Sequence, residues 1–321
     1  MSNIVFLYHP LPLLPKGGDN RPTTSRSYKA FVPFTPLYSP LSPISPLNPN
    51  NPMKKHCRLS LPIIASLLLM LVACGKKQGT VRVAGYEIDS VVIDTTVALT
   101  TQEGAPTCQL SLHLHYLKED KAQGLNDTLL RAGILLPDYF SLSKEKLTVK
   151  ELADSFVGRY LEEYLTEYAP LYRADQEHAT AYNVEYRVHT RFQESANGVL
   201  TNLADMYSYG GGAHGIKQTL ALNIDTDKGT IIRLSNLFQE GTEAQLKEKI
   251  VEQMARQRDV EGLEGLQGQG IFSDGDVYAS ENFILTKDAI TFIYGEDEIA
   301  PHDVGEIRVE IDKDDIQKLM R

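Results

Sequence analysis

The sequence predicts a fold of mixed α-helices and β-strands, in which the strands are joined in antiparallel hairpins. Residues 182–209 alternate apolar and polar side chains on both sides of Asn197-Gly198, a dipeptide typical of a tight hairpin turn. A second hairpin is expected within residues 283–294, which show the same strand, turn and strand pattern. Residues 148–168 instead repeat apolar side chains every four positions, which indicates an amphipathic helix.

The first 52 residues do not have the pattern of a folded domain. They contain 11 of the 16 prolines of the chain. Proline has no backbone N–H, so such a stretch cannot pack as a regular helix or sheet. We therefore interpret residues 1–52 as a misread upstream stretch or a disordered extension, and expect translation to start at Met53.

Residues 53–73 have the pattern of a lipoprotein signal peptide. A basic start precedes an apolar region of 13 residues, Leu61–Ala73. This run is shorter than the roughly 20 residues of a spanning helix, but it has the length of a signal peptide. It ends in "LVACG", which resembles a bacterial lipobox, so we expect Cys74 to be lipidated and to become the N-terminus. The alternative is an ordinary secretory peptide with a chance cysteine.

Cysteine use and charge restrict the classes of partner. Cys57 would leave with the signal peptide and Cys74 would carry lipid, so Cys108 remains alone and no internal disulfide is expected. Residues 1–73 hold seven of the 32 Lys and Arg and one of the 42 Asp and Glu, so the mature chain carries a formal net charge of −16. Such a chain is a poor partner for nucleic acid and suits a cationic partner.

The expected elements follow in order after a short tether at residues 74–80. Residues 107–117 alternate cleanly and predict a strand. The helix beginning at Thr148 carries a capping box with Glu151, and Pro170 is expected to mark its exit.

The C-terminal part continues with strands and helices. Residues 216–224 predict a strand, residues 225–229 a turn, and residues 242–257 a helix. A glycine-rich stretch at 263–276 predicts a mobile loop. A final strand at 307–311 and a short helix at 315–320 complete the chain.

The stretch "MYSYGGGAHGIKQ" (206–218) contains a G-x-G-x-x-G pattern with His214 inside it. In a dinucleotide site this pattern opens a helix, whereas here it joins two strands, and the context of a P-loop is also lacking. No nucleotide cofactor is therefore expected. The glycines most simply provide positive φ angles or a close backbone approach. His214 either hydrogen-bonds backbone in the loop or contacts a ligand.

Three segments carry a resemblance to a known family. "YSYGGGAHG", "LNIDTDKGTIIRLSNLF" and "FILTKDAITFIYGEDEIAPHDVG" resemble, in order, the extracellular domain family of the RsiV anti-sigma factor. Residues 81–205 resemble the accessory domain that precedes the catalytic domain of the PdaC peptidoglycan deacetylase. The resemblance implies an α+β fold of antiparallel sheets with packed helices, in two closely associated subdomains, 81–205 and 206–321.

The same resemblance implies a function in the bacterial cell envelope. The RsiV domain binds lysozyme, so recognition of lysozyme-like proteins or peptidoglycan fragments is expected. A lipobox stands where RsiV has a transmembrane helix, and no segment that binds a sigma factor is present, so sigma-factor signalling is not expected. The catalytic domain of the deacetylase is also missing.

The stretch "YGEDEIAPHDVG" (294–305) concentrates acidic residues beside an aromatic residue and a histidine. It is either a solvated loop in which Pro301 sets a turn, or an acidic contact surface for a cationic protein. The candidate binding residues are Tyr207, Tyr209, Gly211, Gly212, His214, Glu296, Asp297, Glu298, Pro301, His302 and Asp303.

An enzymatic function has less support. His113 and His115 share one face of a strand and could chelate a metal with a carboxylate, but a solvated pair is the simpler interpretation. The chain has none of the H-E-x-x-H, C-x-x-C or G-x-S-x-G motifs, so no metal and no catalytic residue is predicted. The predicted function is a lipid-anchored binding module facing the periplasm or the cell surface. The alternative is a metal- or carboxylate-dependent cell-wall hydrolase.

Overall fold

The computed structural model describes residues 81–119, 122–139, 146–273 and 275–321, which belong to one compact unit. The expected signal peptide, the tether and Cys74 lie outside the described residues. Within the described ranges, no helix combines the length and the apolar character needed to cross a bilayer. The fold class is α+β, as predicted, with two sheets and six α-helices in the described part.

The larger sheet has seven strands that lie side by side in chain order. They are β1 (Val81–Val83), β2 (Tyr86–Ala98), β3 (Thr107–Leu117), β4 (Val184–Ala196), β5 (Val199–Tyr209), β6 (Ile216–Asp225) and β7 (Thr230–Ile231). All neighbouring pairs are antiparallel except β3 and β4, which are parallel. The predicted antiparallel sheets are therefore confirmed, with this one parallel pair as the exception. A long connection that contains α1 and α2 joins β3 to β4. It returns the chain to the end of the sheet at which β3 begins, so that β4 runs parallel to β3.

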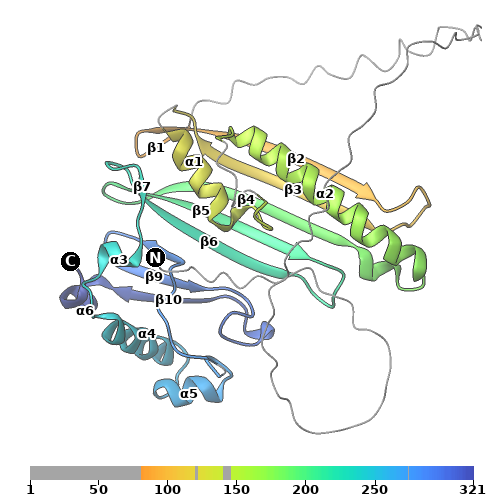
Figure 1. The fold of residues 1–321 in the computed structure, drawn as a ribbon. Helices are drawn as coiled ribbons and strands as arrows, with labels where there is room; N and C mark the ends of the chain where they lie inside the picture. Colours follow the sequence, from red (N-terminus) through yellow and green to blue (C-terminus); the bar gives the residue numbers. More distant parts are fainter. Residues whose placement is uncertain (1–80, 120–121, 140–145, 274) are drawn as a thin grey trace, which may run out of the picture. The chain divides into compact units, whose positions relative to one another are not determined.

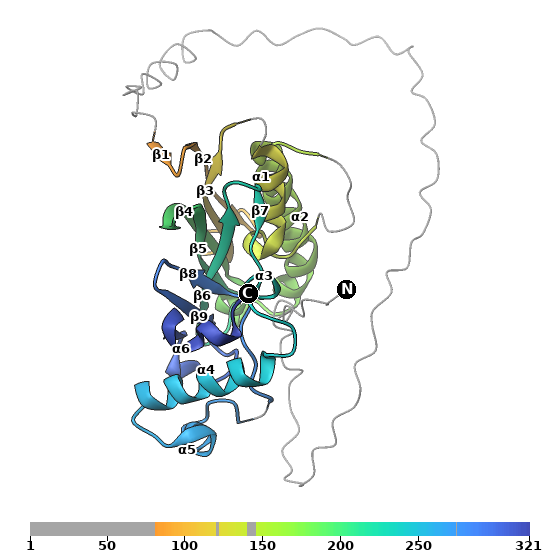
Figure 2. The same cartoon turned by 90° about the vertical axis from the view of Figure 1, so that its left-hand side faces the viewer.

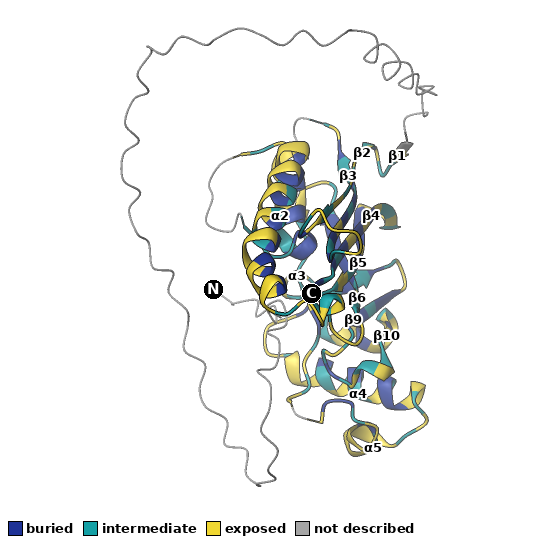
Figure 3. Cartoon of the chain, turned by 90° about the vertical axis from the view of Figure 1, so that its right-hand side faces the viewer, coloured by how far each residue is buried: buried dark blue, intermediate teal, exposed yellow. Residues whose placement is uncertain are grey.

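Two helices cover one face of this sheet (Figure 1). They are α1 (Gln123–Leu129), which continues into a turn at Leu130–Ile134 that is kinked at Gly133, and α2 (Val149–Ala174). The inner side of α2 is buried and its outer side is exposed (Figure 3). Aromatic side chains form most of that inner side: Phe156, Tyr160, Tyr164, Tyr168 and Tyr172. The four-residue repeat in the sequence therefore marks the core face of this helix.

The sequence predicted the start of α2 correctly but not its end. Thr148 accepts a hydrogen bond from the Glu151 backbone, and the Glu151 carboxylate accepts one from the Thr148 backbone, so the predicted capping box is confirmed. The predicted exit at Pro170 is wrong, because the helix continues to Ala174. Proline removes one helical hydrogen bond, but burial of Tyr172 just beyond it offsets that loss.

The smaller sheet lies between the larger sheet and α4 (Figure 2). Its antiparallel strands, in the order β10-β9-β8, are β8 (Phe283–Leu285), β9 (Ala289–Tyr294) and β10 (Ile307–Asp312). The helices around it are α3 (Leu234–Leu237), α4 (Glu243–Gln257), α5 (Gly262–Gly268) and α6 (Lys313–Ile316). One face of this sheet packs on α4, where Ile250 and Met254 join Phe292 and Val309 in a second core.

The glycine-rich stretch at 263–276 is not simply a loop. Its first half forms α5, and the side chains of Leu266, Ile271 and Phe272 are buried against the second core. The prediction of a mobile loop is therefore wrong for this half. Glycine composition argues against a helix locally, but three buried apolar side chains decide the conformation.

The second face of the smaller sheet packs on the face of the larger sheet that α1 and α2 leave uncovered. Leu203, Ala221 and Ile293 form a small apolar core between the sheets. The boundary expected between residues 205 and 206 falls inside β5, so both expected subdomains contribute strands to the larger sheet.

Side chains from the segments that flank the strands of the smaller sheet also cover the free edge of β6. The backbone N–H groups of Lys217, Thr219 and Ala221 donate to side-chain oxygens of Glu296, Glu306 and Asn282, at 2.7, 3.0 and 2.8 Å. An uncovered strand edge exposes unpaired N–H groups that invite association with other strands. These contacts satisfy that edge and hold the two sheets in register.

Candidate functional site

A groove of about 610 Å³ lies on the uncovered face of the larger sheet, beside the smaller sheet. Its floor comes from five strands and its wall from two glutamates. The polar floor residues are Asp94 on β2, Ser111 and His113 on β3, Arg187 and His189 on β4, Asp205 and Tyr207 on β5, and Lys217 and Thr219 on β6. Glu296 and Glu306 form the wall. Concave sites in which polar groups from several elements converge are typical of ligand binding.

Strand register explains why these residues meet. Paired residues on neighbouring strands point to the same face of a sheet. One row across the floor therefore consists of Val92, His113, His189, Asp205 and Thr219, and the next of Asp94, Ser111, Arg187, Tyr207 and Lys217. The polar half of each alternating strand thus forms one continuous surface.

Three histidine rings cluster at one side of the groove. The ring centroids of His113 and His115 are 4.6 Å apart, and those of His113 and His189 are 4.7 Å apart. The third separation, His115 to His189, is 5.7 Å. The rings stack or meet edge to face. As the side chains stand in the described part of the chain, no three His, Cys, Asp or Glu side chains converge on a common metal position.

Two of these histidines are held in the neutral form at neutral pH. Burial and then the neighbouring His189 lower the pKa of His113, and the nearby Asp94 carboxylate offsets part of this effect. Burial also lowers the pKa of His115, against an opposing interaction with the Thr190 backbone. Nδ1 of His115 is buried and has no hydrogen-bond partner within the described residues.

Two arginines at the floor are paired. Arg187 forms an ion pair with Glu185 at 3.1 Å, and its guanidinium lies 4.4 Å from the centroid of the Tyr207 ring. Arg191 pairs with Asp205 across the β4–β5 hairpin.

The polar side chains of the floor on β2 and β3 are also hydrogen-bonded to each other. The Ser111 hydroxyl donates to Asp94 at 2.6 Å. The floor is therefore an ordered polar surface in which side chains already hold one another in place.

The glycine loop is shaped by backbone packing, and its glycines differ. Gly211 has a φ of 80°, and a Cβ at this position would lie 1.9 Å from the carbonyl oxygen of Ala181. A Cβ at Gly215 would lie 2.5 Å from the Tyr207 ring. Gly212 has neither constraint, since a Cβ there would approach nothing closer than 3.9 Å. The predicted backbone role is therefore confirmed for Gly211 and does not hold for Gly212.

The structure brings the glycine loop and the acidic loop together, although they lie far apart in the sequence. The rings of His214 and His302 stack with centroids 3.6 Å apart and an interplanar angle of 19°. Nδ1 of His302 lies 3.0 Å from an Asp297 carboxylate oxygen. His214 is thus paired with a ring of the opposite loop, which the sequence did not predict.

Several carboxylates of the acidic loop are engaged in holding its shape. Glu298 accepts a hydrogen bond from the Gly295 N–H at 2.6 Å and another from the Tyr278 hydroxyl. Glu296 accepts the N–H of Lys217. Asp297 has a φ of 62°, a conformation that aspartate tolerates better than most residues.

Two further residues of this loop, Pro301 and Asp303, are open to solvent. Pro301 precedes a 3-10 turn at His302–Val304, so the predicted turn is confirmed. Tyr209 lies one row beyond Tyr207 on β5, opposite Glu185, and is half-buried.

Most groove residues were not among the sequence candidates, among them Asp94, Arg187, His189, Asp205 and Glu306. Polar alternation along each strand is visible in the sequence. Which of these polar side chains meet in the groove depends on which strands are neighbours and on their register. A single sequence does not contain that information.

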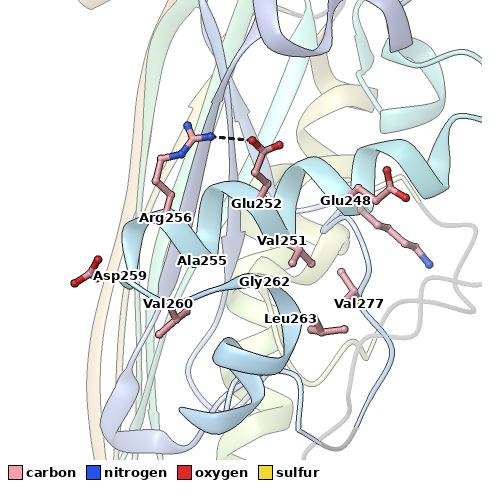
Figure 4. Close-up of a pocket in the computed structure, with 11 residues that line it drawn as sticks. Glu248, Val251, Glu252, Ala255, Arg256, Asp259, Val260, Gly262, Leu263 and Val277 are labelled. Atoms are coloured by element: carbon pink, nitrogen blue, oxygen red, sulfur yellow. Dashed lines mark hydrogen bonds and ion pairs between the residues drawn. The ribbon is translucent and has the colours of Figure 1, made fainter.

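A second groove, of about 800 Å³, lies between α4 and α5 (Figure 4). Val251, Val260, Leu263 and Val277 contribute its apolar part. Two of its charged groups, Glu252 and Arg256, form an ion pair at 2.9 Å. This groove is larger, but it has no converging polar groups like those on the floor of the first groove, which we take as the candidate site.

The family comparison concerns the smaller sheet and its helices. Residues 235–314 match a family described as "Protein of unknown function (DUF3298)". This segment runs from α3 into α6, so it includes the acidic loop but not the glycine loop. No curated protein matches the chain.

Solved structures extend the similarity beyond that segment. A DUF3298 family member from Bacteroides fragilis NCTC 9343 has a TM-score of 0.65 and 24% sequence identity, covering 74% of this chain and 94% of that one. A DUF3298 family protein from Pseudomonas aeruginosa PAO1 has a TM-score of 0.50 and 13% identity, covering 73% and 94%. At these identities the likeness concerns the fold alone. The RsiV-type and PdaC-type assignments remain predictions.

Proposed function

We propose that the protein is a lipid-anchored binding module of the cell envelope that uses the groove and its two adjoining loops to bind a ligand. The observation that carries this proposal is the meeting of the glycine loop and the acidic loop beside a concave polar surface. Binding residues are commonly placed on loops that a rigid scaffold positions. Here the scaffold is the pair of packed sheets.

Charge favours a cationic ligand. Asp94, Asp205, Glu296 and Glu306 line the groove, and the exposed Asp303 lies on the adjoining loop. An acidic surface accelerates the encounter with a cationic protein and disfavours anionic partners. Together with the family resemblance in the sequence, this supports a lysozyme-like protein as the ligand, with peptidoglycan fragments as the second choice.

The groove fits the hydrolase alternative less well. Glycoside hydrolysis requires one carboxylic acid that can donate a proton and a second carboxylate across the scissile bond. In the groove, Glu296 and Glu306 accept backbone N–H groups, and Asp205 and Asp94 are bound by Arg191 and Ser111. All four are occupied as hydrogen-bond acceptors, which suits a structured binding surface.

We expect reversal of exposed acidic charge beside the groove to slow association with lysozyme. The variant is Asp94→Lys with Asp303→Lys, which leaves the shape-holding Glu296, Asp297 and Glu298 intact. The association rate constant at low salt should fall roughly tenfold and become less sensitive to salt, because long-range attraction is lost. Surface plasmon resonance at several salt concentrations measures both effects.

The matched control is Glu162→Lys with Glu167→Lys. These exposed residues lie on α2, which covers the other face of the sheet, and the change in net charge is the same. Equal slowing by the two variants would show that net charge, and not this surface, controls binding. Absence of any lysozyme binding to the wild type would remove lysozyme as the ligand.

The membrane anchor is tested separately. Cells fed an alkyne fatty acid should label the wild-type protein and not Cys74→Ser, because the lipobox cysteine accepts the lipid. The substituted protein should also leave the membrane fraction. Equal labelling of both proteins would contradict lipidation at Cys74, and Cys57→Ser provides a control within the signal peptide.

A further inference from the structure

We propose that the free edge of β2 binds an extended basic segment of a partner protein by strand addition. The inference goes beyond the proposed binding of a lysozyme-like protein and does not depend on it. It rests on the length of the uncovered edge, on the direction of its backbone groups, and on the side chains that border it.

The edge is free because β1 is much shorter than β2. β1 has 3 residues and β2 has 13, and β1 pairs only with residues 86–88 of β2. Residues 89–98 pair with β3 on one side and, in the described part of the chain, with no strand on the other. β2 therefore forms the border of the larger sheet over most of its length (Figure 1).

The backbone groups of every second residue point away from the sheet. At the two ends of the strand, the Lys118 N–H donates to the Glu87 carbonyl and the Leu99 N–H donates to the Pro106 carbonyl, both at 2.9 Å. The odd-numbered residues of β2 therefore face β3. Because the direction alternates along an antiparallel strand, the even-numbered residues 90–96 face the free side.

Three N–H groups on the free side have no hydrogen-bond partner. The Asp89 carboxylate accepts the Ser90 N–H at 2.8 Å. Within the described residues, the N–H groups of Val92, Asp94 and Thr96 donate to no acceptor. The edge of β6, by contrast, is covered by side-chain oxygens. A row of unpaired N–H and carbonyl groups is a template for a further strand.

The sequence of β2 leaves this edge open to pairing. Edge strands are commonly protected by lysine, proline or a bulge. β2 contains neither lysine nor proline, and its pairing with β3 has no register shift. Val92 is 57% exposed, the highest value among the large hydrophobic side chains of the described ranges. A regular strand with an exposed apolar side chain is suited to binding another strand.

The side chains on the two faces of β2 indicate which segment fits. On the helix side, Val91 and Ile93 are half-buried and pack against the main core, so apolar side chains of an added strand would extend that core. The charged residues of β2 are all acidic, and Asp89 and Asp94 are exposed. Opposite charges on neighbouring strands stabilise their pairing. The matching segment therefore alternates basic and apolar side chains.

A second copy of this chain is a poorer occupant of the edge. Pairing of two β2 strands would place two acidic strands side by side, and like charges on neighbouring strands are destabilising. In strand addition, main-chain hydrogen bonds give affinity, and alternate side chains give specificity. Here Val92 and Asp94 also line the groove, so an added strand would continue its floor.

The test measures hydrogen exchange at single amides in the full-length protein in detergent. The probe is a peptide of eight residues that alternates lysine and valine. Without peptide, the amides of Val92, Asp94 and Thr96 should exchange fast and those of Val91 and Ile93 slowly. The peptide should slow the three fast amides, whereas a peptide that alternates glutamate and valine should not.

Three results of this experiment would overturn the proposal. The three amides could already be protected without peptide, which would show that the edge is not free. They could stay fast with the basic peptide. Protection that rises with protein concentration alone would identify a second copy as the occupant.

Variants of β2 provide a second measurement, by fluorescence anisotropy of the labelled basic peptide. Proline is tolerated in an edge strand where its nitrogen faces solvent, so Val92→Pro should fold but lose peptide binding, and Val92→Thr should retain it. Asp94→Asn should weaken binding roughly two- to fivefold. Equal affinity of the proline and threonine variants would contradict strand addition. If circular dichroism shows that Val92→Pro is unfolded, Val92→Lys replaces it, and unchanged affinity of that variant would equally contradict the proposal.

Discussion

Substitution of Gly211 by alanine is expected to lower the free energy of unfolding by about 3 kcal/mol. Two effects add. Alanine at a φ of 80° costs about 1–2 kcal/mol relative to glycine. The new Cβ would also lie 1.9 Å from the Ala181 carbonyl oxygen, so the backbone of one segment must move, and such overpacking costs about 1–3 kcal/mol. Urea unfolding followed by circular dichroism measures the change.

The loss should be visible in thermal unfolding as well. For a domain of this size each kcal/mol shifts Tm by about 2–4 °C, so a decrease of about 10 °C is expected. Ala181 belongs to a 3-10 turn, Ala179–Tyr182, that leads into β4. A shift there would disturb the strand that carries Arg187 and His189.

The adjacent glycine provides the control. Gly212→Ala adds a Cβ in open space at a φ that alanine tolerates, so its effect should stay within about 0.5 kcal/mol. The same urea unfolding experiment measures this effect. If the two variants are equally stable, the loop is not shaped by the contact between Gly211 and Ala181.

Asn223→Ala is expected to lower the free energy of unfolding by about 4 kcal/mol. The buried amide of Asn223 donates to the Phe283 carbonyl at 2.7 Å and accepts the Leu285 N–H at 3.1 Å and the Thr201 hydroxyl at 2.9 Å. Alanine would leave these partners buried without hydrogen bonds, and each such group costs about 1–3 kcal/mol. Tm should fall by about 12 °C.

A neighbouring buried asparagine separates this effect from simple truncation. Asn202 is as buried as Asn223, but its Oδ1 has no hydrogen-bond partner within the described residues. Asn202→Ala should therefore lower the free energy of unfolding by only about 1 kcal/mol. It removes side-chain volume, but no donor loses a hydrogen bond to the Asn202 Oδ1. Equal costs for the two variants would mean that the hydrogen bonds between the sheets contribute little to stability.

Local signals in the sequence were sufficient for several elements. The capping box at Thr148, the turn at Asn197-Gly198 and the strand Thr107–Leu117 are present as predicted. Each depends on residues that are close in the chain, because backbone conformation and alternation of faces are set over a few positions. The same reasoning identified Gly211 as a position with special backbone geometry.

Local signals failed where burial from distant parts of the chain decided the conformation. Pro170 does not end α2, and the glycine-rich residues Gly262–Gly268 form a helix. In both places buried side chains contribute more free energy than the local preference of proline or glycine takes away.

By itself, the sequence determined the types of element, the acidic charge, and which faces of the strands are polar. Only the tertiary structure decided which of these faces meet. The parallel pairing of β3 and β4 brings His189 beside His113, and packing of the smaller sheet brings His302 onto His214. The physical reason is that strand order and sheet packing follow from how the whole chain buries its apolar surface, so contacts between distant polar residues are a consequence of the complete fold.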